Sequence, residues 1–251
     1  MTGMLDPRLV LGAYAVGVFP MADKRDAASV YWVEPRRRAI LPLDGFRLSR
    51  SLRKTVGSDR FRVTADQAFG EVVAMCAEAT PGRPETWIND GIEGVFATLH
   101  AMGFAHSIEC WDGERLVGGL YGLALGRAFF GESMVSRATD ASKVALAWLV
   151  ARLKAGGFDL LDCQFQTDHL ASLGAIEIGR ARYVSLLSSA LAGADGSLGV
   201  AGPGAGEFFA LERLARPPVA AGAGAGAGDS STTVSASLSG KDIVQLLVQT
   251  S

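Results

Sequence analysis

The chain has 251 residues, of which 49% are hydrophobic and 20% charged, as in an ordinary globular protein. Its net charge of −2 excludes a generally cationic surface, so any contact with nucleic acid has to be local. No apolar run reaches the roughly 20 residues that span a bilayer, and Met1 is not followed by a signal peptide. We therefore expect a cytoplasmic protein with no membrane partner.

The cysteines, Cys76, Cys110 and Cys163, are widely spaced. They form neither a C-x-x-C metal motif nor an even set for a disulfide framework, so no metal site is expected. Strand alternation would turn Cys163 away from its polar neighbours, and we expect a buried, unreactive thiol there.

The N-terminal region predicts a short helix over residues 6–16, because Asp6 is a suitable N-cap and Pro7 follows at the first helical position. Residues 36–54 then carry seven basic residues against one acidic residue. In a helix that starts near residue 49, Arg50, Arg53 and Lys54 would share one side. This basic row is either a solvated face or a surface for phosphate groups.

The next segment predicts a strand over residues 61–64, a helix over 69–78, a loop TPGRPE, a helix over 92–102 and a strand over 105–111. Trp87 comes just after the loop. A tryptophan in that position either packs into the core or offers a stacking platform for a base.

The central stretch, residues 116–173, reads as strand, strand, helix, strand, helix. Its first strand contains Gly118, Gly119 and Gly122, which indicates close approach of a ligand or of another backbone. Asp140 is the expected N-cap of the helix, and a pair of glycines at 156–157 ends it.

Three polar residues interrupt strands of this stretch that otherwise look buried. Asp162 and Gln164 would share one face of the strand at 158–165, and Glu132 lies in the preceding strand. Buried polar groups are costly unless they have partners. The pair is therefore either a hydrogen-bonded anchor for the next loop or the polar floor of a reaction site to which Glu132 contributes.

Nine motifs stand in one unbroken order over residues 11–183: AYAVGVFPM, RLSRSLRK, TWI, AHSIECW, LVGGLYG, GESM, DASK, LLDCQ and HLASLGA. Together they resemble the leucyl/phenylalanyl-tRNA–protein transferases. The resemblance implies an α/β (α+β) fold of the acetyltransferase-like (GNAT-type) class, with a mixed sheet, flanking helices and a small N-terminal domain. We expect three parts: a shortened N-terminal domain at 1–38, the aminoacyltransferase domain at 39–192, and a largely flexible Ala/Gly-rich extension at 193–251.

The resemblance also assigns binding roles. Trp87 stands where the family stacks the terminal adenosine of tRNA, with Tyr14 near the same site and Met21 in place of a second aromatic residue. The basic row occupies positions that grip the tRNA acceptor stem. The aminoacyl pocket, unless its members are plain core, is expected to be lined by Phe96, Leu120, Phe129 and Met134.

The activity that the resemblance implies is transfer of Leu, Phe and, less well, Met from aminoacyl-tRNA to proteins that begin with Arg or Lys, marking them for N-end-rule degradation. Aminolysis of an ester needs positioning rather than an enzyme nucleophile, because an α-amino group with a pKa of about 7.7–8.0 is already partly neutral. We assign Gln164 to orienting the amine or the carbonyl, Asp162 to ordering Gln164, and Glu132 to holding the donor's amino group or the acceptor.

No cofactor is expected, and the chain is expected to act as a monomer. An acyl-CoA enzyme of this fold needs a glycine-rich loop for the pyrophosphate, and the segment SRATDASKVA has no glycine. The alternatives are a CoA-dependent acetyltransferase and a non-catalytic tRNA- or protein-binding module on a transferase-like fold.

Overall fold

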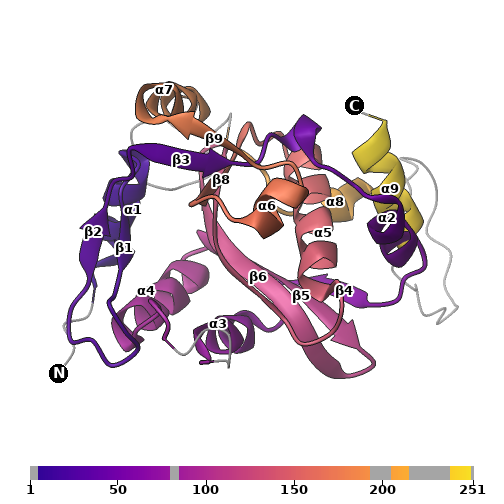
Figure 1. The fold of residues 1–251 in the computed structure, drawn as a ribbon, viewed down its shortest axis with the longest axis horizontal. Helices are drawn as coiled ribbons and strands as arrows, with labels where there is room; N and C mark the ends of the chain where they lie inside the picture. Colours follow the sequence, from indigo (N-terminus) through magenta and orange to yellow (C-terminus); the bar gives the residue numbers. More distant parts are fainter. Residues whose placement is uncertain (1–4, 80–84, 193–204, 215–237, 250–251) are drawn as a thin grey trace, which may run out of the picture.

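A seven-stranded mixed sheet runs through the centre of the molecule, with helices on both faces (Figure 1). The structure is a computed structural model that describes residues 5–79, 85–192, 205–214 and 238–249. Its strand order is β4-β5-β6-β7-β8-β3-β9. The loop TPGRPE, apart from its last residue, and the Ala/Gly-rich stretch at 220–233 lie outside the described residues.

The strands of the central sheet are β3 (Arg37–Ile40), β4 (Arg62–Ala65), β5 (Ala105–Asp112), β6 (Arg115–Leu125), β7 (Ala128–Ser136), β8 (Leu160–Gln164) and β9 (Ile176–Gly179). A separate two-stranded sheet consists of β1 (Phe19–Met21) and β2 (Tyr31–Val33). The helices are α1 (Pro7–Ala15), the 3-10 turn η1 (Leu43–Gly45), α2 (Arg50–Gly57), α3 (Phe69–Ala77), α4 (Asp90–Ala101), α5 (Ala141–Ala155), α6 (Asp168–Ser172), α7 (Arg180–Leu191), α8 (Ala210–Leu214) and α9 (Gly240–Val248).

The predicted strand, strand, helix, strand, helix order of the central stretch is confirmed. β5, β6 and β7 form an antiparallel meander, and β7 then pairs in parallel with β8 through the crossover helix α5. A parallel pair needs such a long connection, whereas antiparallel neighbours are joined by tight turns. The predicted α/β (α+β) class, with a mixed sheet and flanking helices, is confirmed.

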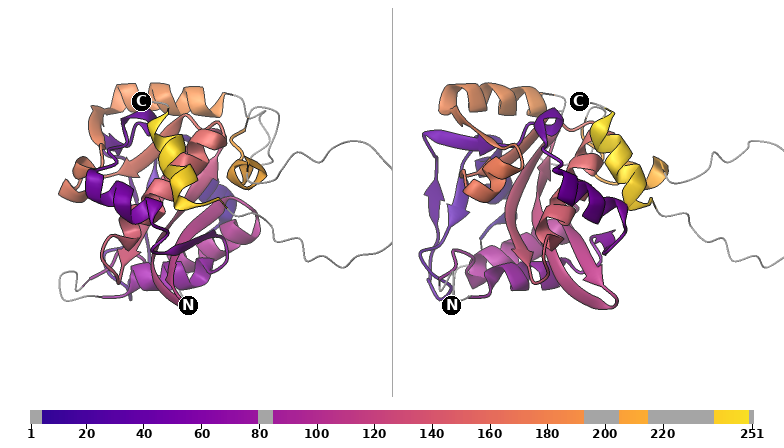
Figure 2. Two further views of the ribbon diagram at one scale, coloured as in Figure 1. Left: turned by 90° about the vertical axis from the view of Figure 1, so that its right-hand side faces the viewer. Right: turned by 45° about the vertical axis from the view of Figure 1, so that its right-hand side comes forward.

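Helices cover the two faces of the sheet unequally. α3 and α4 pack on one face, and α1 packs against α4. On the other face α5 lies against β5, β6 and β7, with α2 and α9 side by side beyond it (Figure 2). Because α5 is enclosed in this way, most of its side chains are buried, among them the apolar Leu146, Leu149, Val150 and Leu153.

One prediction about local structure is wrong. Asp140 does not cap α5: its φ is 69° and its carboxylate pairs with Lys143 at 3.0 Å. The Ser136 hydroxyl accepts a hydrogen bond from the backbone N–H of Ser142 instead, at 3.2 Å.

Within the C-terminal extension, the described parts form the docked helices α8 and α9. Within the described residues, no helix is long and apolar enough to cross a membrane.

Candidate active site

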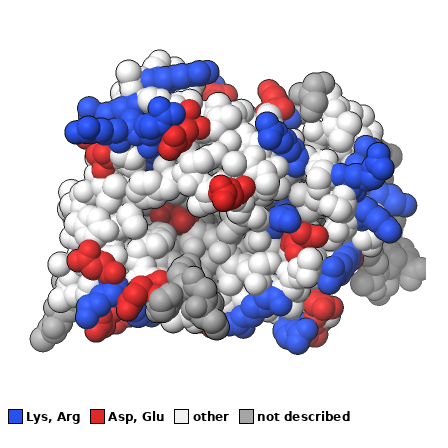
Figure 3. All heavy atoms as spheres, viewed as in Figure 1, with Lys and Arg blue, Asp and Glu red and all other residues white. Residues whose placement is uncertain are grey.

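A cavity of about 280 Å³ opens where the parallel strands β7 and β8 separate. Their ladder pairs Phe130 with Asp162 and ends there. Beyond that point the two backbones diverge, so the side chains that follow on each strand line an opening instead of pairing with one another. Figure 3 shows this side of the molecule hollowed, with a recessed acidic side chain in the hollow.

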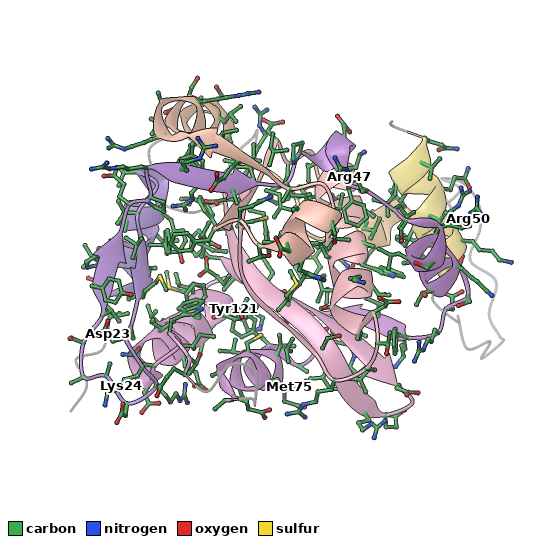
Figure 4. All side chains as sticks on the ribbon, viewed as in Figure 1. Asp23, Lys24, Arg47, Arg50, Met75 and Tyr121 are labelled. Carbon is green, nitrogen blue, oxygen red and sulfur yellow. The ribbon has the colours of Figure 1, made fainter. Side chains whose placement is uncertain are left out.

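The cavity wall is mainly apolar. The sheet contributes Leu120, Tyr121, Met134, Leu161 and Cys163, the helices contribute Leu146, Leu149, His169 and Leu170, and a further set consists of Phe19, Met21, Trp87 and Phe165. Figure 4 labels Tyr121, whose ring packs edge-on against the core residues Phe69 and Phe96.

The polar part of the wall contains a hydrogen-bonded pair from the two diverging strands. Gln164 Nε2 donates to Glu132 Oε1 at 3.0 Å. Gln164 has a left-handed backbone with φ of 55°, which a non-glycine residue adopts only at a cost of roughly 1–2 kcal/mol. This turn breaks the side-chain alternation of β8. As a result Gln164 lines the cavity, whereas Asp162 does not. Strain of this kind concentrates at functional sites.

Burial raises the pKa of Glu132 to about 8. Among its neighbours, the Tyr14 hydroxyl, the Arg38 guanidinium and the Gln164 amide favour the ionised form, while the charge of Asp162 opposes it. Glu132 is therefore largely protonated at neutral pH, and it forms an uncharged polar pair with Gln164.

Stability should fall as the pH rises from about 5 to 8, because the native state keeps a proton on Glu132 that the unfolded chain releases near its ordinary pKa. With more protons bound in the native state, the free energy of unfolding declines by at most about 1.4 kcal/mol per pH unit. Urea unfolding at several pH values tests this for the wild type and for Glu132→Gln. If both proteins show the same pH dependence, the raised pKa is not the cause.

Asp162 is fully buried and does not line the cavity, which corrects the expectation that it emerges beside Gln164. It accepts hydrogen bonds from Arg38 Nε at 2.9 Å and Nη2 at 2.6 Å, from the Tyr183 hydroxyl at 2.7 Å, and from the backbone N–H of Gln164 at 2.8 Å. The last bond holds the left-handed turn directly. Asp162 is thus placed to position Gln164 from behind.

Arg38 is only 1% exposed, so it is not part of an exposed basic surface, although it lies in the basic segment of residues 36–54. Its guanidinium lies 4.6 Å from the ring of Phe19 and 4.7 Å from that of Tyr183, and Nη1 donates to the carbonyl of Gly17 at 3.1 Å. This bidentate, stacked geometry suits arginine and would not be reproduced by lysine.

Three other predicted site residues lie in the core instead. Tyr14 is fully buried beside Phe130, so its ring has no face free for an adenosine, and burial raises the pKa of its hydroxyl. Phe96 is fully buried on the inner face of α4, to which it belongs. Phe129 is also buried, in the paired part of β7, where its ring contacts those of Phe158 and Phe208.

The structure does bring Trp87, Leu120 and Met134 to the cavity, and it leaves the basic row exposed on α2. Cys163 lines the cavity together with Gln164 and is only partly buried, contrary to the expectation of a buried thiol turned away from its polar neighbours. Desolvation raises its pKa well above the usual range, which agrees with the expected unreactive thiol. Among the described residues, no group of His, Cys, Asp and Glu could hold a metal ion.

Sequence reasoning missed Arg38 and Tyr183, the two side chains that anchor Asp162. The strand RRAI contains a signal for Arg38, because strand alternation puts Arg38 on the face opposite to that of Arg37, and apolar residues follow. In the structure the side chain of Arg37 is 63% exposed. A hydrogen-bonded polar pair in the wall of an apolar cavity, between two diverging strands, is an arrangement that suits an enzyme that positions two reactants for group transfer.

Comparison with known proteins gives the particular family. Residues 40–188 match the family model described as Leucyl/phenylalanyl-tRNA protein transferase, and residues 3–36 match the N-terminal domain of the same family. The chain belongs to the leucyl/phenylalanyl-tRNA–protein transferase family, whose members are aminoacyltransferases.

Curated relatives agree over most of the chain. The leucyl/phenylalanyl-tRNA–protein transferase of Rhizorhabdus wittichii is 63% identical and covers 98% of this chain and 99% of its own length. That of Zymomonas mobilis is also 63% identical, over 76% of this chain and 71% of its own. Among solved structures, L-PGS from Bacillus licheniformis aligns with a TM-score of 0.37 at 14% identity, over 64% of this chain and 53% of its own, which adds nothing to the assignment.

Proposed function

We propose that this enzyme transfers Leu, Phe and, less readily, Met from aminoacyl-tRNA to the α-amino group of proteins that begin with Arg or Lys. It would act in the cytoplasm as a monomer and mark its acceptors for N-end-rule degradation. The observation that carries the proposal is the cavity between β7 and β8, which combines an apolar wall with the Glu132–Gln164 pair.

The apolar wall suits the side chain of the transferred amino acid. Leu120, Met134, Leu146 and Leu149 surround a space of about 280 Å³. Small-molecule sites usually measure roughly 300–1,000 Å³, so this one fits a single aminoacyl group. The flexible thioether of Met134 would adapt to a branched, aromatic or thioether side chain.

In the transfer step, the acceptor's α-amine attacks the ester carbonyl, a C–N bond forms, and the C–O bond to the tRNA ribose breaks. The proton lost by the amine goes to the departing ribose hydroxyl. The carboxamide of Gln164 would orient the amine or the carbonyl, and Glu132, ionised by a neighbouring ammonium group, would hold the donor's α-amino group or the acceptor. Asp162 would keep Gln164 in place.

The RNA would be held outside the cavity. Trp87 lines the same opening as Met21 and offers a surface for the terminal adenosine, while the exposed basic row on α2 would contact phosphates. A glycine-rich pyrophosphate cradle for CoA is not expected, because the connection from β7 to α5 lacks glycine.

Transfer of labelled leucine from charged tRNA to a reporter protein with N-terminal Arg tests the function. We expect label on that reporter and on one with N-terminal Lys. A reporter with N-terminal Gly, and the Arg reporter with its α-amino group acetylated, should stay unlabelled. If the acetylated reporter is labelled as strongly as the free one, or if none is labelled, the proposal is wrong.

A further inference from the structure

The C-terminal helix α9 is fixed against α2, the helix that carries the basic row. Its buried side chains Ile243, Val244 and Leu247 pack into the core formed around α5. The helix begins with a capping box made by Ser239 and Asp242. This contact is therefore specific, although the two helices lie far apart in the sequence.

The close approach occurs at Gly240. Its backbone N–H donates to Asp59 Oδ1 at 2.6 Å, and a Cβ at this position would collide with the carbonyl oxygen of Val56. Only glycine permits this contact, since any larger residue would push α9 away from α2.

A groove of about 570 Å³ lies between the two helices. Its cations are Arg53 and Lys54 from α2 and Lys241 from α9. The rest of its wall is uncharged and includes the side chains of Ser58, Gln245 and Gln249. The lining therefore offers positive charge and neutral hydrogen-bond donors, the two kinds of group that contact phosphate oxygens.

The cations of this groove form no ion pairs with described carboxylates. In the part of the chain that the structure describes, Arg50, Arg53, Lys54 and Lys241 have no ion pair, whereas many other arginines are paired with carboxylates. The acidic neighbours Asp59 and Asp242 accept hydrogen bonds at the start of α9. Figure 3 shows Lys and Arg side chains gathered at the right-hand edge over α2 and α9, and Figure 4 labels Arg50 there.

We infer that α9 completes an RNA-binding groove with α2, in which Lys241 and the basic row contact the phosphate backbone of the donor tRNA. This inference rests on the proposed function. Figure 3 shows the basic side chains over α2 and α9 on the same side of the molecule as the hollowed cavity, so one extended polyanion could reach both. The C-terminal segment would thus supply part of the substrate-binding surface.

Binding of deacylated tRNA to the full-length protein at several salt concentrations tests the groove. Lys241→Gln should reduce the slope of log K against log salt by about one, which near 0.1 M salt corresponds to an affinity loss of close to tenfold. Lys241→Arg should restore both values. Arg182→Gln removes from α7 an exposed cation that forms no ion pair with any described residue. It is the matched control and should change neither the slope nor the affinity.

Transfer kinetics separate this inference from the proposed function. Lys241→Gln should raise KM for aminoacyl-tRNA with kcat unchanged, and Gly240→Ala, which displaces the helix, should raise KM at least as much. If wild-type protein transfers the amino acid and both variants keep its KM and salt slope, the groove is wrong while the function holds. If the two variants lost as much affinity for polyglutamate as for tRNA, specific RNA recognition by the groove would be contradicted. If the wild-type protein transferred no amino acid, the proposed function would be contradicted.

Discussion

Replacing Arg38 by methionine should lower the free energy of unfolding by about 3–5 kcal/mol, because it leaves the fully buried carboxylate of Asp162 without its cation. Arg38 supplies three hydrogen bonds to that carboxylate, and the remaining donors, Tyr183 and a backbone N–H, are neutral. Urea unfolding followed by circular dichroism measures the loss.

The adjacent arginine offers a matched control. Arg37 pairs with Glu177 at 2.6 Å, but its side chain is 63% exposed, and exposed pairs contribute about 0–1 kcal/mol. Arg37→Met should therefore leave the unfolding midpoint almost unchanged. Similar losses for the two variants would mean that the Arg38–Asp162 pair does not carry the stability ascribed to it.

Shortening Gln164 to asparagine should reduce amino acid transfer by about 100-fold or more while the fold remains intact. Asparagine tolerates the left-handed backbone of this position, so the turn is kept while the amide withdraws from Glu132 by one methylene. Gln164→Ala should give a similar loss of kcat. Single-turnover transfer of labelled leucine measures the effect, with thermal unfolding as the check on folding.

Gln166→Asn is the control for this prediction. Gln166 also donates a side-chain hydrogen bond, to the carbonyl of Ala175 at 3.0 Å, but it does not line the cavity. We expect near-normal transfer from this variant. Full activity of Gln164→Asn would mean that Gln164 has no role in the transfer reaction. Equal losses in Gln164→Asn and Gln166→Asn would indicate a general disturbance of the segment after β8.

Much of the fold could be predicted because local signals agree with it. The observed bounds of α1, α3, β4 and β5 lie within about two residues of those expected, since caps, glycines and periodic apolar residues mark their ends. By contrast, β3 joins the sheet through partners far along the chain. No local pattern announces such pairing.

The site was harder to predict than the fold. Strand alternation puts Asp162 and Gln164 on one face, but the left-handed turn at Gln164 separates them, and no glycine marks that turn in the sequence. Apolar periodicity also cannot distinguish a cavity wall from solid core. That is why Leu120 lines the cavity whereas Phe96 and Phe129 do not.

The hydrogen-bonded cluster of Arg38, Asp162 and Tyr183 behind Gln164 has a consequence for the folding of the newly synthesised chain. Arg38 and Asp162 are 124 residues apart, and Tyr183 comes later still. All three residues must therefore have left the ribosome before the cluster can form. Contacts of such long sequence separation form slowly. A nascent chain that already contains the cavity strands would therefore remain inactive until α7 has been synthesised and docked.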